Sequence, residues 1–182
     1  MSAIGTLRAR TEECHALVDA AFCAFDLGDE DSYREFLTAH ARVLPTVENI
    51  LSRDPALPKI RLRTPALASD MAQLQQPMPE LLKLTGPIAG AAAWGILYVV
   101  EGSRLGGGIL SARVGANLPT TYLAARHEPG EWRALGQAIE TQSARHGHDW
   151  IAAAVAGAEA CFDLFRQACD AYRLDRIGQC SP

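Results

Sequence analysis

The sequence lacks the features that mark membrane, secreted and nucleic-acid-binding proteins. Its longest apolar stretch, residues 86–100, is too short for the roughly 20 residues that cross a bilayer. The first ten residues include two arginines and no apolar run, so we expect no signal peptide. Lysine and arginine together number 17 against 21 acidic residues, and no basic stripe alternates with aromatic residues. A nucleic-acid partner and a membrane span are therefore not expected.

Cysteine is present, but in no metal-binding or redox pattern. The five cysteines are odd in number and include no C-x-x-C pair, which favours reduced thiols in the cytoplasm. Cys161 and Cys169 are expected to be small core residues of a helix. The chain also has no phosphate-binding loop, dinucleotide-binding fingerprint or G-x-S-x-G motif, so nothing indicates a nucleotide-dependent enzyme or a serine hydrolase.

Apolar residues recur every three or four positions along most of the chain, and no segment alternates as a strand would. This pattern predicts an all-α, single-domain, multi-helix bundle over residues 1–182, with its core in about 4–174 and a C-terminal tail in 175–182. Fraying is expected from Gly178 to Pro182. Asp31 or Ser32 is expected to cap the second helix, and Pro45 to kink or break it. The expected helices cover residues 4–25, 33–52, 66–74, 87–114, 132–142 and 150–174, with an irregular segment at 117–130.

The most informative segment is Glu101-Gly102-Ser103-Arg104-Leu105-Gly106-Gly107-Gly108, which continues an apolar stretch. A glycine inside a helix costs about 0.8–1 kcal/mol relative to alanine, so these four glycines together cost about 3–4 kcal/mol. A helix that accepts this cost usually kinks or lets a flat, bulky group approach its backbone. The same spacing also fits a loop between two helices.

His15 lies beside the apolar stripe of the first expected helix, where an imidazole is either a core residue or a metal ligand. Asp19 follows one turn later and is placed to accept a ring N–H, which would fix the tautomer of a ligating histidine. Glu12-x-x-His15 is also half of a di-iron carboxylate motif, but the chain has no second copy. His146-Gly147-His148-Asp149 is expected to be a solvated turn, with a surface metal site as the alternative. Ser103 is not expected to be a catalytic nucleophile, because no strand precedes it and the sequence indicates no general base for it.

Together, the histidine and glycine segments resemble the haem (heme) oxygenase family. The run from Leu7 to His15 is similar to that family's first helix, in which a threonine precedes the proximal heme-ligand histidine by four residues. The run from Tyr98 to Gly107 is similar to its distal helix. The E-G-S-x-L-G pattern is most like the bacterial branch that supplies biliverdin to phytochromes. Further residues match the family in the same order along the chain, so the resemblance covers about residues 4–172. They are the run from Tyr33 to Leu37 with His40 and Glu48, and Phe162 and Phe165 of the last expected helix.

The resemblance implies that heme is sandwiched between the first helix and a kinked, glycine-rich distal helix. His15 would bind the iron as a neutral imidazole, and Asp19 would support it in the place of a glutamate of animal relatives. The implied catalytic residues are Gly102, Ser103 and Gly106. The implied heme-binding residues are His15, Gly102, Gly106, Gly107 and Phe162, with Arg133 and Arg8 for the propionates and Gln137 where animal enzymes have a second basic residue.

Ser103 departs from the pattern of animal enzymes, which carry an aspartate there to organise water around bound oxygen. A hydroxyl also holds water but has no charge. Because the bacterial branch commonly lacks this aspartate, we interpret Ser103 as a variation of the water network.

The resemblance implies an enzyme that cleaves heme with O2 to biliverdin, carbon monoxide and ferrous iron, with heme as both substrate and cofactor. A ferredoxin or reductase would supply the electrons, and a phytochrome is a candidate recipient of biliverdin. One alternative is a heme-binding protein without turnover (a carrier, a sensor or an inactive paralogue) that uses the same His15 site. A fold relative that holds another ligand is a third. The distal glycines favour the enzyme, since heme storage needs no backbone so close to oxygen.

Overall fold

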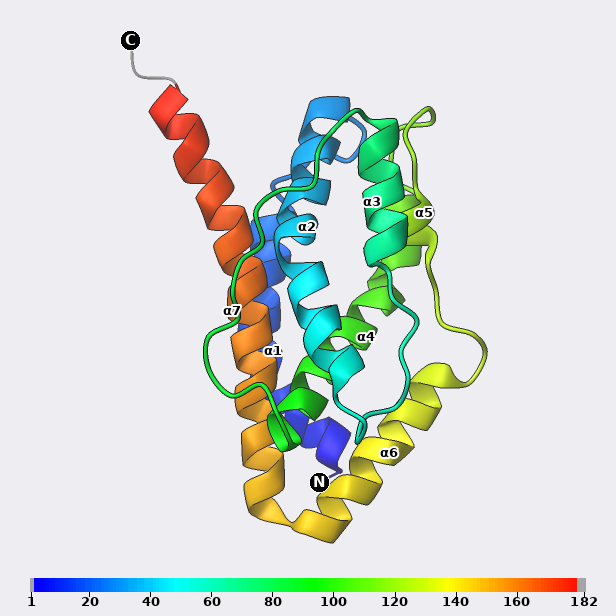
Figure 1. Cartoon of the computed structure of the whole chain (residues 1–182), viewed down its shortest axis with the longest axis vertical. Coiled ribbons are helices and arrows are strands. Elements are labelled where there is room, and N and C mark those ends of the chain that lie inside the picture. Colours follow the sequence, from blue (N-terminus) through cyan, green and yellow to red (C-terminus); the bar gives the residue numbers. More distant parts are fainter. Residues whose placement is uncertain (1, 180–182) are drawn as a thin grey trace.

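Helices form all the regular structure of the computed structural model, which describes residues 2–179. The all-α prediction is therefore confirmed for this part of the chain (Figure 1). None of these helices has the combination of length and apolar character that a membrane crossing requires. The helices are α1 (Ala3–Phe22), α2 (Glu30–Arg53), α3 (Thr64–Gln73), α4 (Ala91–Ser111), α5 (Thr121–Ala124), α6 (Glu131–His146) and α7 (His148–Gln179).

The start of α2 is decided by a cap that differs from the expected one. Asp29, rather than Asp31 or Ser32, caps this helix, because its carboxylate accepts the Ser32 N–H at 2.9 Å. The Ser32 hydroxyl accepts the backbone N–H of Asp26 at 2.8 Å instead. The expectation was wrong because the cap depends on how the preceding turn bends, and residue spacing does not reveal that bend.

Pro45 lies inside α2, which nevertheless runs without a break. Of the two predicted effects of this residue, the break is therefore wrong, and the kink stays a prediction. The 74–90 connection lies beside it: the Leu82 N–H donates to the Arg42 carbonyl at 2.8 Å, and the Thr46 hydroxyl donates to the Leu82 carbonyl at 2.8 Å. These bonds support the helix where proline removes an N–H from its ladder.

The glycine-rich segment is helical throughout, because α4 continues without interruption to Ser111. A loop between two helices, the alternative interpretation, is thus excluded. The helix begins later than expected, after Gly90, whose φ of +59° is rarely adopted by other residues. At the other end of the chain, α7 runs past its expected end at residue 174, and residues 180–182 of the predicted tail lie outside the described residues.

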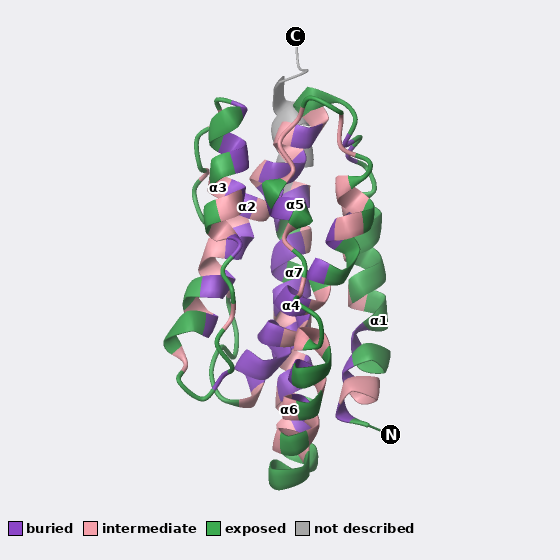
Figure 2. Cartoon of the chain, turned by 90° about the vertical axis from the view of Figure 1, so that its right-hand side faces the viewer, coloured by how far each residue is buried: buried purple, intermediate pink, exposed green. Residues whose placement is uncertain are grey.

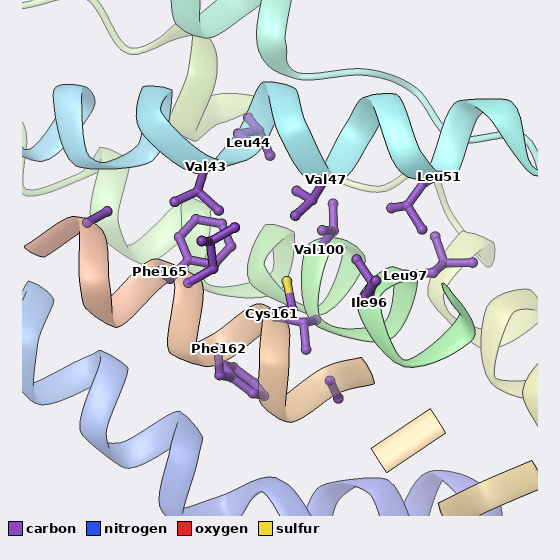
Figure 3. Packing of buried hydrophobic residues seen from close by; sticks show 14 of the residues in the cluster. Val43, Leu44, Val47, Leu51, Ile96, Leu97, Val100, Cys161, Phe162 and Phe165 are labelled. Carbon is purple, nitrogen blue, oxygen red and sulfur yellow. The ribbon is translucent and has the colours of Figure 1, made fainter. Parts of the chain in front are cut away.

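α4 and α7 form the centre of the fold and approach each other through small residues. A Cβ on Gly95 of α4 would collide with the Ala154 carbonyl of α7, and one on Gly157 of α7 would collide with the Ala92 carbonyl of α4. Only glycine therefore lets these helices cross so closely. The buried thiol of Cys161 lies in this core, as predicted, and burial raises its pKa to about 12. α2 covers the pair with the apolar stripe shown in Figure 3, formed by Val43, Leu44, Val47 and Leu51.

α1 lies on the opposite side of α7 from α2 and α3 (Figure 2). It packs on α7 and, near its start, on α6, and makes little or no direct contact with α4 in the described structure. Only four of its 20 residues are buried: Ala3, Leu7, Thr11 and Ala21. A broad side of α1 is therefore exposed, and His15 lies on it.

Candidate functional site

His15 projects from the exposed side of α1, where its side chain is 61% exposed. Its Nδ1 lies 3.0 Å from Oδ2 of Asp19, one helical turn further on. When the carboxylate accepts a hydrogen bond from Nδ1–H, a neutral imidazole keeps the electron pair of Nε2 free. This arrangement, which the residue spacing predicts, is typical of histidines that bind metals.

Phe162 of α7 limits how the His15 ring can turn. The ring centroids lie 5.6 Å apart and the planes meet edge to face at 79°. Phe162 is itself buried in the core, so it forms a fixed wall beside the imidazole. Thr11, one turn before His15, is also buried, and its hydroxyl donates to the Leu7 carbonyl at 2.8 Å. The threonine of the first-helix motif thus bonds to the helix backbone and not to the imidazole.

Two glycines of α4 border space that no other part of the described chain fills tightly. A Cβ built on Gly106 would meet no atom within 4 Å, and one on Gly102 would lie 3.6 Å from the Trp132 ring, an ordinary contact. Packing within the described chain therefore requires glycine at neither position. Leu105 and Ile109, on the same side of the helix, are 55% and 73% exposed. This combination of bare backbone and apolar side chains suits a large planar ligand.

Gly107 has different surroundings from Gly106. It is buried, and a Cβ on it would lie 2.5 Å from the carbonyl oxygen of Leu123 in α5. Glycine is needed here because it lets α5 pack against α4. The structure therefore explains Gly107 by packing, and its place at a heme face stays a prediction.

Ser103 is held by a buried arginine. Nη2 of Arg63 donates to the Ser103 hydroxyl at 2.7 Å and to the Val100 carbonyl at 2.8 Å. The Ser103 hydroxyl donates to the same carbonyl at 2.7 Å. The Arg63 guanidinium also lies 5.5 Å from the centre of the Tyr122 ring, within cation–π range. The serine oxygen keeps one lone pair, so it can accept a further hydrogen bond but has no proton left to donate.

Arg63 is placed by Glu48 of α2, whose side chain is buried. The Glu48 carboxylate accepts the backbone N–H groups of Arg63 at 2.7 Å and Thr64 at 3.0 Å, so it caps α3 from a neighbouring helix. Residue spacing carries no signal for this role. Arg63 lies in the proline- and arginine-rich 54–65 connection, and all its side-chain partners are distant in sequence.

A second buried polar cluster extends from α4 to the loop before α6. Oε2 of Glu101 accepts from Nε of Arg104 at 2.9 Å and lies 3.0 Å from Nε2 of His127. The His127 ring lies 5.9 Å from the ring of Trp132 at the start of α6. The cluster therefore ties α6 to the glycine-bearing helix.

His40 of α2 is a largely buried imidazole surrounded by aromatic rings. Its Nδ1 donates to the Phe36 carbonyl at 2.9 Å, and its ring centroid lies 4.5 Å from that of Phe22 in α1. Burial lowers the pKa of His40 to about 4; the bond to Phe36 opposes this shift and the charge of Arg63 adds to it. His40 is therefore uncharged at neutral pH.

Arg133 and Gln137 line a hollow of about 680 Å³ between α6 and the start of α1. Arg8 does not line it, although it lies two turns before His15 on the same helix. The structure therefore brings Arg133 and Gln137 together and does not place Arg8 with them. The other lining residues are Ile4, Trp132, Gly136, Glu140 and Thr141.

Within the part of the chain that the structure describes, no group of three or more histidine, cysteine, aspartate or glutamate residues could hold a metal ion. Neither the Glu12–His15 pair nor the His146–His148 turn gains a further protein ligand there. A single histidine ligand is nevertheless sufficient when the metal is heme iron, because the porphyrin supplies four of its ligands.

Comparison of the sequence with known proteins shows the family of this chain, and comparison of the structure shows a shared fold. No family model matches the sequence. The chain is 33% identical over 153 residues to a heme oxygenase of Xanthomonas campestris pv. campestris (strain 8004). The aligned region covers 75% of this chain and 88% of that protein. The fold of this chain is similar to that of the NO- and CO-bound heme oxygenase from Neisseria meningitidis, with a TM-score of 0.80. That match has 22% sequence identity and covers 94% of this chain and 92% of the other.

Proposed function

Because this chain belongs to the heme oxygenase family, we propose that it cleaves heme oxidatively with O2 and external electrons to biliverdin, carbon monoxide and ferrous iron. One observation carries the assignment of the site. An accessible His15 has its Nδ1 engaged by Asp19, while Gly106 on α4 borders open space. A metal ligand and a bare helix backbone are the two surfaces between which a flat ligand can be held.

The residues present fit heme. His15 provides one neutral nitrogen ligand, and the side of α4 that carries Gly106 is flanked by the exposed apolar side chains of Leu105 and Ile109. Arg133 provides a cation for a propionate, with Gln137 one turn further along α6. When bound, heme supplies the iron at which O2 is activated and the ring that is oxidised.

On the α1 side, the chain controls the ligand nitrogen. Asp19 keeps the proton on Nδ1, so Nε2 stays available to the iron. Phe162 packs edge-on against the ring and restricts its rotation. A neutral imidazole donates less electron density than a thiolate, which disfavours the O–O cleavage chemistry of thiolate-ligated enzymes.

On the α4 side, the hydrogen bonds that the Ser103 hydroxyl already makes determine whether it can donate to a water molecule or accept from one. Its own proton goes to the Val100 carbonyl and one of its lone pairs accepts from Arg63. Ser103 can therefore hold a water molecule only by accepting a hydrogen bond from it. An ionised aspartate is likewise only an acceptor, so Ser103 reproduces that property without the charge.

The finer assignments follow from the motifs. The E-G-S-x-L-G pattern supports membership of the bacterial branch that supplies phytochromes, with a ferredoxin or reductase as electron donor in the cytoplasm. Arg133 is the proposed main propionate partner, with Arg8 as a second. Residues 4–174 are proposed to form the one catalytic domain.

A hemin titration followed by reduction tests the proposal. One equivalent of hemin should give a saturating Soret band, and ascorbate under air should convert it to the broad red absorption of biliverdin. His15→Ala should lose the normal axial ligation and most of the turnover. Asp19→Asn is the matched variant: it keeps the ligand and weakens only its partner, so it should retain the Soret band.

Three results would contradict parts of this proposal. An unchanged spectrum and turnover in His15→Ala would remove the role of that residue. A stable Soret band that never decays would leave a heme-binding protein without oxygenase activity. The absence of any Soret band would exclude both functions.

A further inference from the structure

The first turn of α1 is completed by a side chain from another helix. The first N–H groups of a helix have no acceptor within it. The Ser2 hydroxyl accepts the N–H of Gly5 at 3.0 Å. The N–H groups of Ala3 and Ile4 donate to the two carboxylate oxygens of Glu140, in α6, at 2.9 and 3.0 Å. These bonds join positions more than 130 residues apart in the chain.

This contact lies where α1 and α6 meet. The Ile4 side chain packs beside Gly136, one turn before Glu140, where a Cβ would lie 3.8 Å from its Cγ1 atom. In Figure 1 the two helices converge near the N-terminus of the chain and diverge beyond it. α6 buries Leu135 and Ile139 and packs Trp132 and Ala138 against the core. Apolar contacts of this kind have no direction, whereas the hydrogen bonds of Glu140 do, so they add a directional link between α6 and α1.

Building on the proposed function, we propose that Glu140 is a positioning residue that fixes the axial register of α1 against α6. His15 lies 12 residues beyond Ala3 on α1, a helical distance of about 18 Å. Arg133 lies seven residues before Glu140 on α6, a helical distance of about 10 Å. The contact of Glu140 with the start of α1 thus fixes the position of His15 along α1 relative to that of Arg133 along α6.

The consequence concerns how heme is seated. With the iron held by His15 and a propionate by Arg133, a shift of α1 along α6 turns or slides the ring between them. The meso carbon presented for oxidation would then change, so Glu140 would influence which biliverdin isomer forms. A carboxylate suits the task because both of its oxygens accept, whereas an amide of the same length has one oxygen and an NH2 group that cannot accept from an N–H.

The test compares Glu140→Gln with Ser2→Ala. Both substitutions remove hydrogen bonds from the same helix end, but Ser2 is the residue that directly precedes α1 and does not link it to α6. The first readout is amide hydrogen exchange of the heme-free proteins, which should quicken at Ala3 and Ile4 in Glu140→Gln. The second is the hemin Kd, and the third is the ratio of biliverdin isomers.

We expect Glu140→Gln to raise the hemin Kd several-fold and to broaden the isomer mixture, while Ser2→Ala keeps the wild-type values of both. Glu140→Asp, which keeps the charge on a shorter arm, should fall between wild type and Glu140→Gln and serves if the latter does not fold. Wild-type Kd and isomer ratio in Glu140→Gln, despite faster exchange at Ala3 and Ile4, would overturn the positioning role alone. Failure of the wild-type protein to bind hemin would overturn the proposed function and this inference with it.

Discussion

Replacing Gly106 by alanine should stabilise the heme-free protein and weaken its binding of heme. Gly106 lies inside α4, and a Cβ added there meets no atom within 4 Å. Alanine is favoured over glycine in a helix by about 0.8–1 kcal/mol. The heme-free variant should therefore gain about 1 kcal/mol of stability, or about 2–4 °C in Tm for a chain of this size.

Heme binding should change in the opposite direction. The open space before Gly106 is where we propose that the ring lies, so the added methyl group would press on it. Overpacking of this kind costs about 1–3 kcal/mol, which raises the hemin Kd roughly five- to 150-fold. Gly106→Leu, with a larger side chain at the same place, should block hemin binding more completely.

Gly107→Ala is the matched control, one residue further along the same helix. Its Cβ would lie 2.5 Å from the Leu123 carbonyl oxygen, so α5 has to shift. The gain in helix propensity, about 0.8–1 kcal/mol, is the same as at Gly106. Because a backbone carbonyl cannot move aside as a flexible side chain does, overpacking should cost an amount in the upper part of the range of about 1–3 kcal/mol and outweigh the gain. The heme-free Gly107→Ala protein should therefore be less stable than wild type.

Urea unfolding of the heme-free proteins and hemin titrations measure the two effects separately. A loss of stability in heme-free Gly106→Ala would show that the space before this residue is not open. A stabilised Gly106→Ala with the wild-type hemin Kd would show that heme does not lie against this glycine.

Two further predictions concern buried polar groups. The pKa of His40 is about 4 in the folded protein and about 6.5 in the unfolded chain, so the unfolded chain binds its proton first. Wild type should therefore lose up to about 3 kcal/mol of stability as the pH falls from 6.5 to 4. His40→Leu, which has no group to protonate at this position, should lose less. Urea unfolding at several pH values checks this, and parallel curves for the two proteins would contradict it. Arg63→Met should slow single-turnover heme cleavage roughly tenfold while leaving the hemin Kd nearly unchanged. The loss is smaller than the roughly 100-fold or more that a positioned proton donor or acceptor contributes, because Arg63 acts through Ser103. In a double-mutant cycle Ser103→Ala should add little to that loss, and fully additive effects would show that the two residues act independently.

Interactions between neighbours in sequence could be predicted from the sequence alone. Apolar periodicity predicted six of the described helices but not α5, which lies in a segment that was expected to be irregular. The contact of His15 with Asp19 follows from a spacing of four residues on one helix. The cap of α2 was assigned to the wrong residue even though it is local, because Asp29, Asp31 and Ser32 are all good caps and only the turn geometry selects one.

Contacts between distant segments required the tertiary structure. Arg63 binds Ser103, 40 residues away in sequence, and Glu140 binds the Ala3 N–H, 137 residues away. No sequence motif indicates either contact. Such contacts depend on which helices pack together and at what angle, and apolar periodicity predicts that a face is buried without identifying what buries it.

Gly106 and Gly107 show, in two adjacent residues, which properties the sequence determines and which depend on tertiary packing. The sequence alone determined that both lie in a glycine-rich segment with a helix cost of about 1 kcal/mol each. Consecutive residues of a helix point about 100° apart, since a turn takes 3.6 residues. Which of the two faces the Leu123 backbone and which faces open space was decided only when α5 packed on one side of α4.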